Sequence, residues 1–387
     1  MVKKPKLLIL SNDLKKGGIE RIIINSCSYF NDRNYSTDIL LLKNIIHYET
    51  AHNKNINIDF IIKSKKKLSI FYVLLKLKKI TTIFKKYNII LSHHDFSNYI
   101  NIITSLIFKT HKSIIVLHTY PKFYLYNQMN ITGFVKFIIH KYLQKYIYKF
   151  ANEIIVISNH LKQYSKNEIK KNATLIYNPL IKNILIDNKK FNKIKKKFIC
   201  VGTLTKRKNQ ILILKAFNYL NKIKFLKKNN IQLEIIGEGK ELNNLKNYIE
   251  KNNLAEFVTI IKNHENIDEI YSDAYCLISA SKLEGIPNVF VESLSLNLPI
   301  ITSDIPAAFE LFGDQNTQFI KIDDYKIVDY GIIFNRSNYI NLINSIVYFI
   351  NNHEKYCNIR FNISKKESKF SIENNSEYLK LIDKIYI

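Results

Sequence analysis

The sequence contains few of the residues that interrupt or cross-link a protein chain. It has 9 Gly and 6 Pro among 387 residues, whereas average usage gives about 27 Gly and about 19 Pro at this length. Collagen, low-complexity linkers and Gly/Pro-rich repeats are therefore excluded. The four cysteines lie far apart and form no C-x-x-C pair, so we expect neither a disulfide framework nor a structural zinc site. They are Cys27, Cys200, Cys276 and Cys357.

Long apolar runs are also missing. No stretch approaches 18 uncharged apolar residues, so we expect no transmembrane helix. The apolar run after the first lysines is too short for the core of a signal peptide. These features favour a reduced, cytoplasmic protein.

Acidic residues are scarce relative to basic ones. The sequence has 32 Asp and Glu and 59 Lys and Arg, which gives a net charge of +27. Clustered cations of this kind can bind nucleic acid by releasing counterions from phosphate. Lysine is abundant throughout this chain, however, in loops and helices alike. A diffuse background charge is therefore favoured over a nucleic-acid-binding stripe.

The apolar residues are numerous enough for ordinary cores. They make up 47% of the chain, and chains beyond about 250–300 residues usually divide, so two domains are expected. Short apolar runs alternate with longer stretches of helical period, which predicts the α/β class with parallel sheets. The predicted strands of the first series are Leu7–Ser11, Asp38–Leu42, Ile56–Ile61, Asn88–Ser92, Ser113–Leu117 and Glu153–Ser158. Those of the second are Phe198–Gly202, Gln232–Gly237, Val258–Lys262, Tyr275–Ala280, Pro299–Thr302 and Gly331–Phe334.

A polar, Lys-rich segment, Asn178–Lys197, separates the two series and begins at an Asn-Pro turn signal. We therefore predict one domain over residues 1–193 and a second over residues 194–364. Ligands of open α/β sheets bind at the carboxyl ends of the strands, so two such domains facing each other would share one cleft. Residues 365–387 predict a closing helix that packs back on the first domain.

Two segments combine lysine with aromatic and aliphatic residues. They are Ser64–Asn88 and Val135–Phe150. Each could be a basic amphipathic helix on an anionic membrane surface. Each could equally be an ordinary helix that packs its apolar side on a sheet and keeps its lysines in water. The sequence leaves both alternatives open.

Glycine is rare enough that its positions are informative. Gly17 and Gly18 form the one Gly-Gly pair and stand between the first predicted strand and a helical run. Such a loop leaves backbone N–H groups at a helix N-terminus, where they favour phosphate. A tight turn that needs positive φ is the alternative.

Three consecutive cations follow the first strand of the second series. Lys206, Arg207 and Lys208 stand at its carboxyl end, which is the place for a diphosphate-binding cation in an α/β domain. Taken alone, a solvated charge run explains them as well.

The most specific pattern is the segment Ser279–Glu310. A strand ends there, a loop carries Glu284 and Gly285, Pro287 suits a first helical turn, and Glu292 lies on the helix behind. A carboxylate accepts hydrogen bonds from a vicinal diol such as a ribose. The N–H groups of Asn288 and Val289 at the helix start favour an anion.

These motifs resemble the retaining GT-B glycosyltransferases of family 4 type, which carry a Glu, seven residues, Glu signature. The resemblance extends over the chain through the Gly-Gly loop, V-I-S-N-H, I-Y-N-P, G-T-L-x-x-x-K-N, I-I-G-E-G and, most specifically, E-G-I-P-N-V-F-V-E. It implies the GT-B fold, with two Rossmann-like domains facing a shared cleft. It also implies a hexosyltransferase that uses a nucleotide-sugar donor.

The resemblance assigns roles to residues. Glu292 would hold the ribose, Glu284 the donor sugar, and Lys208 the diphosphate. Arg207 would supply a second cation, because Thr203 stands where many relatives have Arg. His118 matches the family's active-site histidine, although a histidine at a strand end is often structural.

The remaining donor contacts follow from the same resemblance. The amides of Gly17 and Gly18, and the helix start at Asn288 and Val289, would contact the diphosphate. Gly285 and Pro287 would also belong to the donor site. His93 and His94, also at a strand end, are weaker candidates. Lys262 stands where relatives have Gly, near the expected base-binding region Lys262–His264.

The function expected from this reading is retaining transfer of a sugar, most simply from a UDP-sugar. The acceptor would be a lipid-linked or surface glycan of O-antigen, capsule or lipopolysaccharide type. No D-x-D motif occurs, so we expect no metal and no cofactor beyond the donor. An anionic membrane surface is a possible partner, with the protein cytoplasmic or peripheral on the inner face of the plasma membrane, and nucleic acid is not expected. The alternatives are a soluble sucrose, trehalose or glycogen synthase of the same fold, and a non-catalytic nucleic-acid-binding or scaffold protein.

Overall fold

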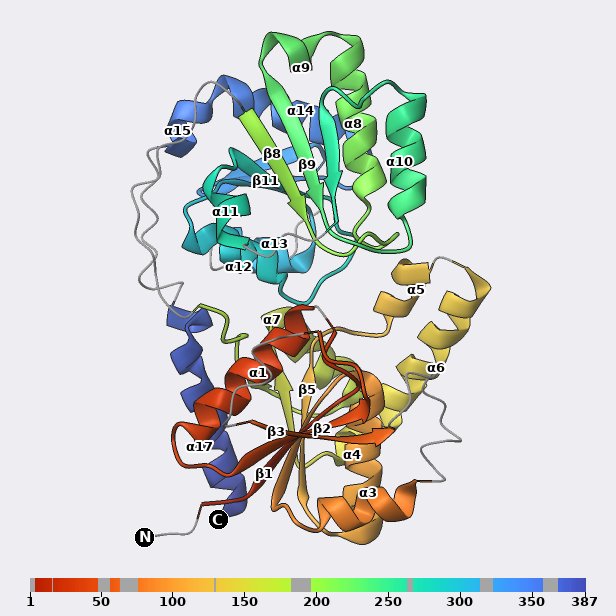
Figure 1. Ribbon diagram of the computed structural model, residues 1–387, viewed down its shortest axis with the longest axis vertical. Helices are drawn as coiled ribbons and strands as arrows, with labels where there is room; N and C mark the ends of the chain where they lie inside the picture. Colours follow the sequence, from red (N-terminus) through yellow and green to blue (C-terminus); the bar gives the residue numbers. More distant parts are fainter. Residues whose placement is uncertain are drawn as a thin grey trace. The chain divides into compact units, whose positions relative to one another are not determined.

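The computed structural model describes residues 4–15, 17–47, 56–62, 76–128, 130–181, 196–262, 267–313, 323–357 and 368–387 (Figure 1). The chain forms two compact units. The first consists of Met1–Pro121, Ile138–Lys182 and Ser368–Ile387, and the second of Lys122–Phe137 and Asn183–Glu367. The chain thus enters the first unit three times.

The first unit is built on a seven-stranded sheet of order β3-β2-β1-β4-β5-β6-β7 in which every pairing is parallel. Its central strands are buried on both faces and are near-continuous runs of Ile, Leu and Val, as parallel sheets covered by helices require. The strands are β1 (Leu7–Ser11), β2 (Thr37–Lys43), β3 (Asn57–Ile62), β4 (Ile89–His93), β5 (Lys112–Leu117), β6 (Glu153–Val156) and β7 (Thr174–Leu175).

Helices that alternate with these strands cover the sheet. They are α1 (Gly18–Asn31), α3 (Leu77–Phe84), α4 (Asp95–Phe108), the second half of α6 (Ile131–Ile147) with η2 (Tyr148–Phe150), α7 (Asn159–Tyr164) and the π-helical turn η3 (Ser165–Ile169). The last segment, with η4 (Ser368–Phe370), η5 (Ile372–Asn374) and α17 (Asn375–Tyr386), also belongs to this unit. Figure 1 shows α17 running along α1, with which it is in contact.

The second unit repeats the plan. Its sheet has the order β10-β9-β8-β11-β12-β14-β13, and all pairs are parallel except β13 with β14. The strands are β8 (Lys196–Val201), β9 (Ile231–Ile236), β10 (Val258–Ile261), β11 (Cys276–Ser279), β12 (Ile300–Ser303), β13 (Tyr325–Val328) and β14 (Gly331–Phe334). The helices are α5 (Lys122–Gln128), the first half of α6, α8 (Gln210–Lys222), α9 (Phe225–Lys228), α10 (Leu242–Lys251), α11 (Ile267–Ser272), α12 (Asn288–Ser295), α13 (Pro306–Phe312), α14 (Tyr339–Asn351) and α15 (His353–Cys357).

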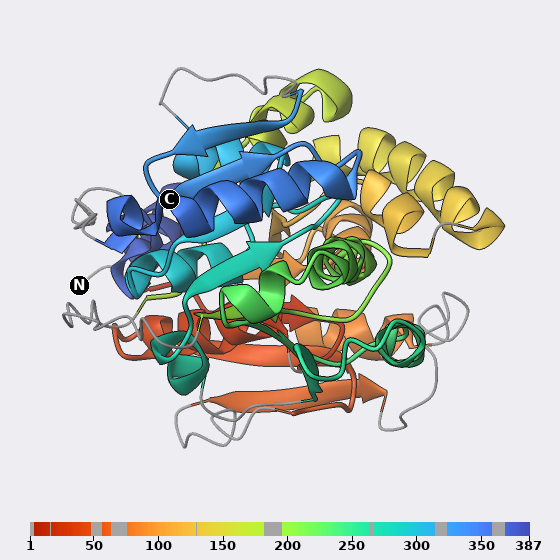
Figure 2. The ribbon, with the colours of Figure 1, turned by 90° about the horizontal axis from the view of Figure 1, so that it is seen from above.

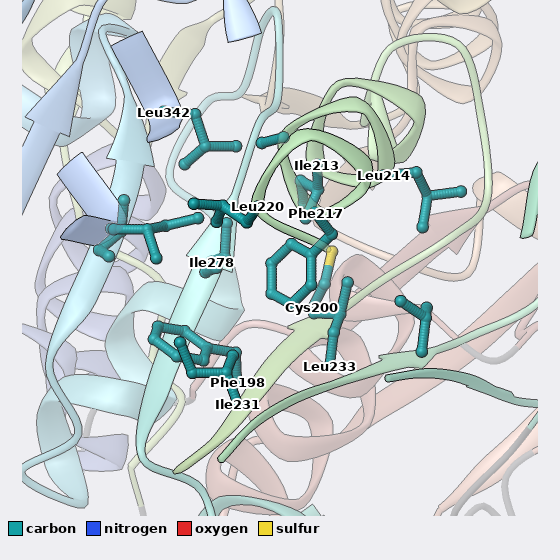
Figure 3. Close-up of a cluster of buried hydrophobic side chains, with 14 of the residues drawn as sticks. Phe198, Cys200, Ile213, Leu214, Phe217, Leu220, Ile231, Leu233, Ile278 and Leu342 are labelled. Carbon is teal, nitrogen blue, oxygen red and sulfur yellow. The ribbon is translucent and has the colours of Figure 1, made fainter. Parts of the chain in front are cut away.

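The core of the second unit lies between its sheet and α8. Figure 3 shows Phe217 and Leu220 of α8 over Phe198 of β8, with Ile278 of β11 and Leu342 of α14 beside them. All five side chains are completely buried. α14 packs beside α8 and against β14, and it is the long blue helix of Figure 2.

The prediction of an α/β protein with two parallel sheets is confirmed, and each of the twelve predicted strands is present within two residues of its expected bounds. The sequence did not indicate β7 and β13. The domain boundaries at residues 193 and 364 and the shared cleft stay predictions.

The two basic segments have different outcomes. Of Ser64–Asn88, the described part contains α3, which buries Ile80 and Phe84 in the core as an ordinary helix does. Residues 64–75 lie outside the described residues. Val135–Phe150 coincides with most of α6 and η2, whose apolar residues are largely exposed.

Candidate active site

Both sheets have a point where the strand order changes direction. In the first unit the point lies between β1 and β4, and in the second it lies between β8 and β11. The loops that leave neighbouring strands at such a point diverge to opposite faces of the sheet and open a crevice at the carboxyl ends. The residues singled out in the sequence follow β1, β4, β5, β8 and β11, so the fold places them at these two edges.

In the second unit, the loops after β8 and β11 bring the predicted cations and one carboxylate together. Nη1 of Arg207 lies 2.5 Å from Oε1 of Glu284, and Nζ of Lys208 lies 2.8 Å from the same oxygen. The side chains of Arg207, Lys208 and Glu284 are 10%, 15% and 12% exposed. Lys206, between the same strand and helix, is exposed.

Arg207 is held on several sides. Its Nη1 donates a hydrogen bond to the carbonyl of Leu283 at 2.8 Å, and its own carbonyl accepts one from the N–H of Lys282. The guanidinium carbon lies 4.9 Å from the centre of the Phe123 ring, within cation–π range. Arg207 therefore ties the loop after β8 to the loop that carries Glu284.

These charges control the ionisation of Glu284. Burial raises the pKa of its carboxyl group, but the charges of Arg207 and Lys208 outweigh burial and hold the pKa at about 2. Burial, and then the charge of Lys206, lower the pKa of Lys282. Lys282 therefore also lies near these charges. Two cations thus contact one carboxylate, and the site has an excess of positive charge that suits a polyanion.

Two glycines make room for the cationic loop, which follows β8 and carries Lys206, Arg207 and Lys208. A Cβ atom at Gly202, where φ is +142°, would lie 3.3 Å from Cε of Lys208, so the missing side chain makes room for this lysine. A Cβ atom at Gly237, where φ is +150°, would collide with the carbonyl of Gly202. The loops after β8 and β9 therefore pack backbone to backbone, with the N–H of Leu204 bonded to the carbonyl of Glu238 at 2.8 Å.

The helix behind Glu284 starts as the sequence indicated, with one difference. Pro287 is the N-cap of α12 and not a residue of its first turn, so Asn288 and Val289 are the first two helical residues. Both are half-buried, while Gly285 and Pro287 are buried. The N–H groups of Asn288 and Val289 belong to the first turn, where no intrahelical acceptor exists.

Glu292 lies one turn further along α12. Its Oε2 accepts a hydrogen bond of 2.9 Å from the hydroxyl of Tyr271, and Tyr271 of α11 is completely buried. The tyrosine therefore fixes one oxygen of this carboxylate. Nothing in the sequence pairs residues 271 and 292, so this partner was not predicted.

In the first unit, Gly17 is the N-cap of α1 and Gly18 its first residue. Gly17 has φ −167°, an extended conformation that any residue adopts, so the alternative of a positive-φ turn does not hold there. Glu20 is the third residue of the helix, and its carboxylate folds back on Gly17. An acidic side chain in this position is stabilised by the positive end of the helix dipole. The sequence analysis did not single out Glu20, although its spacing from Gly17 is that of a capping residue.

Three histidines lie at the carboxyl ends of β4 and β5. Nδ1 of His93 is 2.9 Å from Nε2 of His118, and both side chains are buried. His94, the N-cap of α4, contacts Ser11 through Nδ1 at 3.2 Å and Glu20 through Nε2 at 3.4 Å. Among the described residues, Nδ1 of His118 and Nε2 of His93 have no hydrogen-bond partner.

Burial keeps this histidine pair neutral. It lowers the pKa of His118 to about 3, with a further contribution from His94. It also lowers the pKa of His93, well below the ordinary value, together with the charges of His118 and His94. A neutral imidazole donates one hydrogen bond and accepts another, so His118 acts here as a hydrogen-bonding group and not as a cation.

Lys262 begins the region expected to bind a base, just after β10, and is exposed. His264 lies outside the described residues. In the part of the chain that the structure describes, no group of three or more His, Cys, Asp and Glu side chains is placed to hold a metal ion. No helix in those residues is long and apolar enough to cross a membrane.

Known proteins share part of this sequence. Residues 182–362 match the family described as glycosyl transferases group 1. The O-antigen biosynthesis glycosyltransferase WclY of Escherichia coli is 29% identical over 217 residues, which cover 54% of this chain and 58% of that protein. The N-acetylgalactosamine-N,N'-diacetylbacillosaminyl-diphospho-undecaprenol 4-alpha-N-acetylgalactosaminyltransferase of Campylobacter jejuni is 27% identical over 322 residues, which cover 80% of this chain and 84% of that protein.

Solved structures agree on the fold. Anabaena Alr3699/HepE in complex with UDP-glucose superposes with a TM-score of 0.75 at 16% identity, over 98% of this chain and 100% of that chain. The fold is therefore GT-B. Residues 182–362 match the group 1 glycosyltransferases, and relatives of the chain are named for O-antigen biosynthesis and for a diphospho-undecaprenol-linked sugar. The chain spans about six-tenths of the length of three curated relatives that it matches over 217 to 254 residues.

Proposed function

We propose that this protein is a retaining glycosyltransferase that moves a sugar from a UDP-sugar to a lipid-linked or surface-glycan acceptor. The observation that supports this most directly is the surplus of cations around Glu284, at the strand-order switch of the second sheet. Two relatives are named for O-antigen and diphospho-undecaprenol substrates, and a structural neighbour was solved with UDP-glucose. A cytoplasmic location fits a nucleotide-sugar donor.

The donor's diphosphate occupies the cationic loop in this proposal. Lys208 is the cation that meets it, because its Nζ lies over Gly202, where no side chain intervenes. The first N–H groups of α12, at Asn288 and Val289, add donors for a phosphate oxygen. Arg207 acts as a positioning residue, since its guanidinium is already bonded to Glu284 and Leu283.

The two carboxylates divide the rest of the donor between them. Glu292, with one oxygen fixed by Tyr271, accepts hydrogen bonds from the ribose hydroxyls. Glu284 is ionised at neutral pH because of its cations, so it accepts hydrogen bonds from the hydroxyls of the transferred sugar. Gly285 and Pro287 shape the turn between these two residues.

In the proposed reaction, the neutral imidazole of His118 forms a hydrogen bond with the sugar, and His93 holds the imidazole ring of His118 in position. The backbone at Gly17 and Gly18 contacts the donor phosphates. The bond between the anomeric carbon and the diphosphate oxygen breaks through an oxocarbenium-like state. The acceptor oxygen bonds to the anomeric carbon on the face from which the diphosphate leaves, and its proton passes to the departing diphosphate. Stabilising that diphosphate is therefore the main task of the protein side chains.

Ligand-induced stabilisation tests the donor site without an acceptor. We expect UDP to raise the unfolding temperature of the wild type, since a ligand at 100 times its Kd adds about 2.7 kcal/mol to the free energy of unfolding. Lys208→Met and Glu292→Gln remove a phosphate contact and a ribose contact, so UDP should no longer raise their unfolding temperatures. Lys206→Met and Glu250→Gln, which change exposed side chains, should respond as the wild type does.

The same panel contains the results that would overturn the proposal. A rise with GDP or ADP but not with UDP would exclude the proposed base. An unchanged response to UDP in Lys208→Met and Glu292→Gln would exclude the proposed site. Transfer onto a lipid-linked acceptor, with the anomeric configuration of the product read by NMR, separates retention from inversion.

A further inference from the structure

Helix α6 buries polar side chains and leaves a line of apolar side chains exposed. Toward the first unit, Gln144 donates a hydrogen bond of 2.9 Å to Oδ1 of Asp95, and Tyr148, just after the helix, donates one of 2.6 Å to the same oxygen. Nδ1 of His140 lies 2.9 Å from the hydroxyl of Tyr99. Gln144 and Tyr148 are completely buried. A helix of a water-soluble domain normally buries its apolar residues, so the number that α6 leaves exposed is unusual.

The outward side is an apolar stripe along the whole helix. At about 100° per residue, the first five stripe residues fall within an arc of about 80°, and η2 extends their line by one residue. They are between 48% and 79% exposed, and Tyr142 stacks on Tyr146 with the ring planes 4° apart. The α6 stripe consists of Ile131, Val135, Ile139, Tyr142, Tyr146 and Phe150.

Exposed apolar residues also end the neighbouring helix. Ile103, Leu106, Ile107 and Phe108 of α4 are 39% to 63% exposed. Tyr99 and Asp95 of α4 contact α6, and η2 packs against α4. Ile103 and Leu106 lie on the same side of α4 as these two residues, because they follow at three- and four-residue steps. The apolar surface of the first unit is therefore larger than one helix side.

The charges beside the stripe have one sign. Residues 131–150 contain Lys136, Lys141, Lys145 and Lys149 and no Asp or Glu. Nζ of Lys149 lies 5.0 Å from the centre of the Phe150 ring, and Nζ of Lys145 lies 5.6 Å from that of Tyr146. A second copy of the chain would present the same cations, so pairing of two such surfaces is opposed by repulsion. An anionic surface complements them.

We propose that the α6 stripe docks on the surface of an anionic lipid bilayer, with α6 lying in the plane of the interface. The helix is about 25 Å long and its apolar residues are in line, so all of them reach the acyl boundary together. Tyrosine rings and lysine stems suit this depth, since each places an apolar body below a polar tip. The inference deepens the proposed function and rests on it in one respect: it names the surface at which a lipid-linked acceptor meets the enzyme.

A tryptophan reporter tests the contact directly. The chain has no tryptophan, so Tyr146→Trp introduces a single fluorophore into the stripe, and Tyr219→Trp places one at an equally exposed site on α8. We expect vesicles of phosphatidylcholine with phosphatidylglycerol to shift the emission of Tyr146→Trp to shorter wavelength. Phosphatidylcholine alone should not shift it, and neither vesicle should shift the emission of Tyr219→Trp.

Sedimentation with the same vesicles separates the two contributions to binding. Lys141→Gln/Lys145→Gln/Lys149→Gln should weaken partitioning about 100-fold, since each lysine at an anionic surface contributes about fivefold. Ile139→Ser/Tyr142→Ser should weaken it about tenfold or more while every lysine remains. Lys222→Gln/Lys246→Gln/Lys251→Gln removes the same charge from the second unit and should bind as the wild type does.

Three results would overturn the proposal. Equal loss of binding in the two lysine triples would mean that the +27 charge acts diffusely. An unshifted emission of Tyr146→Trp on anionic vesicles would mean that the stripe does not touch lipid. A dimer seen by sedimentation velocity that is lost in Ile139→Ser/Tyr142→Ser would make the stripe a protein interface. All measurements omit nucleotide, and each variant keeps its UDP response if folded, so a failure of docking is distinguishable from a failure of the donor site.

Discussion

At the residue scale, Arg207 and Lys208 share one carboxylate but differ in their other contacts. Lys208 is bonded to Glu284 alone among the contacts described above, whereas Arg207 also bonds the carbonyl of Leu283 and stacks on Phe123. A planar guanidinium can make these contacts together, and an ammonium cannot. The run of three cations in the sequence therefore contains one exposed residue, one that is held on several sides, and one that we propose binds the donor.

Removal of Arg207 should destabilise the second unit. Arg207→Met leaves Glu284 buried with one cation, and loss of one partner of a buried ion pair costs about 3–5 kcal/mol. We expect the free energy of unfolding at pH 7 to fall by about 3 kcal/mol, measured by urea denaturation. Lys206→Met, the adjacent exposed cation, should change it by less than about 0.5 kcal/mol. Equal values for the two variants would contradict the buried pair.

The sequence indicated the residues of the proposed site but not their contacts. Lys208, Glu284 and Glu292 could be chosen because their motifs are specific, and the structure brings the first two into contact. The roles of Tyr271 and Leu283 could not be predicted, because a hydroxyl 21 residues from its carboxylate and a backbone carbonyl leave no pattern in a sequence. The contacts of Arg207 with Glu284 and of His93 with His118 could not be predicted either, because the sequence does not show which residues are buried together.

At the element scale, the strands were predictable and the faces of one helix were not. Buried parallel strands are continuous apolar runs, so they stand out from their surroundings. β7 has two residues, both half-buried, and β13 is an edge strand with Lys326 in it, so neither forms such a run. In α6, the helical period was visible, but the sequence did not show that Gln144 and Tyr148 are buried in hydrogen bonds to Asp95 while many apolar residues stay exposed.

The contact between the loops after β8 and β9 should depend on Gly237. Gly237→Ala adds a Cβ atom that collides with the carbonyl of Gly202 at a φ of +150°. We expect the free energy of unfolding to fall by about 3 kcal/mol, from strained backbone and the displaced loop. Gly17→Ala is the matched control, since φ there is −167° and the new atom meets only the end of the flexible Glu20 side chain. A smaller loss in Gly237→Ala than in Gly17→Ala would contradict this account.

At the scale of the whole molecule, the two units differ in the pH at which acid weakens them. In the first unit, burial holds the pKa of His118 at about 3, that of His111 at about 4, and that of His93 below its ordinary value. These histidines are neutral in the folded state and take up protons when unfolded below about pH 6.5. The second unit depends on Glu284, whose lowered pKa contributes stability that is lost only below about pH 4.5.

Acidification should therefore unfold the first unit before the second. Between about pH 6 and pH 5, each buried histidine should lower the free energy of unfolding by about 1.4 kcal/mol per pH unit, or about 4 kcal/mol for the three. Urea titrations at several pH values measure this slope. His111→Gln, which can keep a hydrogen bond to Asn101, should reduce it by about one third. An unchanged slope would show that His111 is not neutral in the fold.

The return of the chain to its first unit has a consequence for biosynthesis. Ser26, Tyr29 and Tyr35, in and just after α1, bond to Asn375, Glu373 and Asp383, which lie almost 350 residues later. On the ribosome, the first unit must wait for these partners until the second unit has been translated. The early segment carries the apolar core of a sheet during that delay, so its assembly depends on the rate of elongation and on chaperones that cover it.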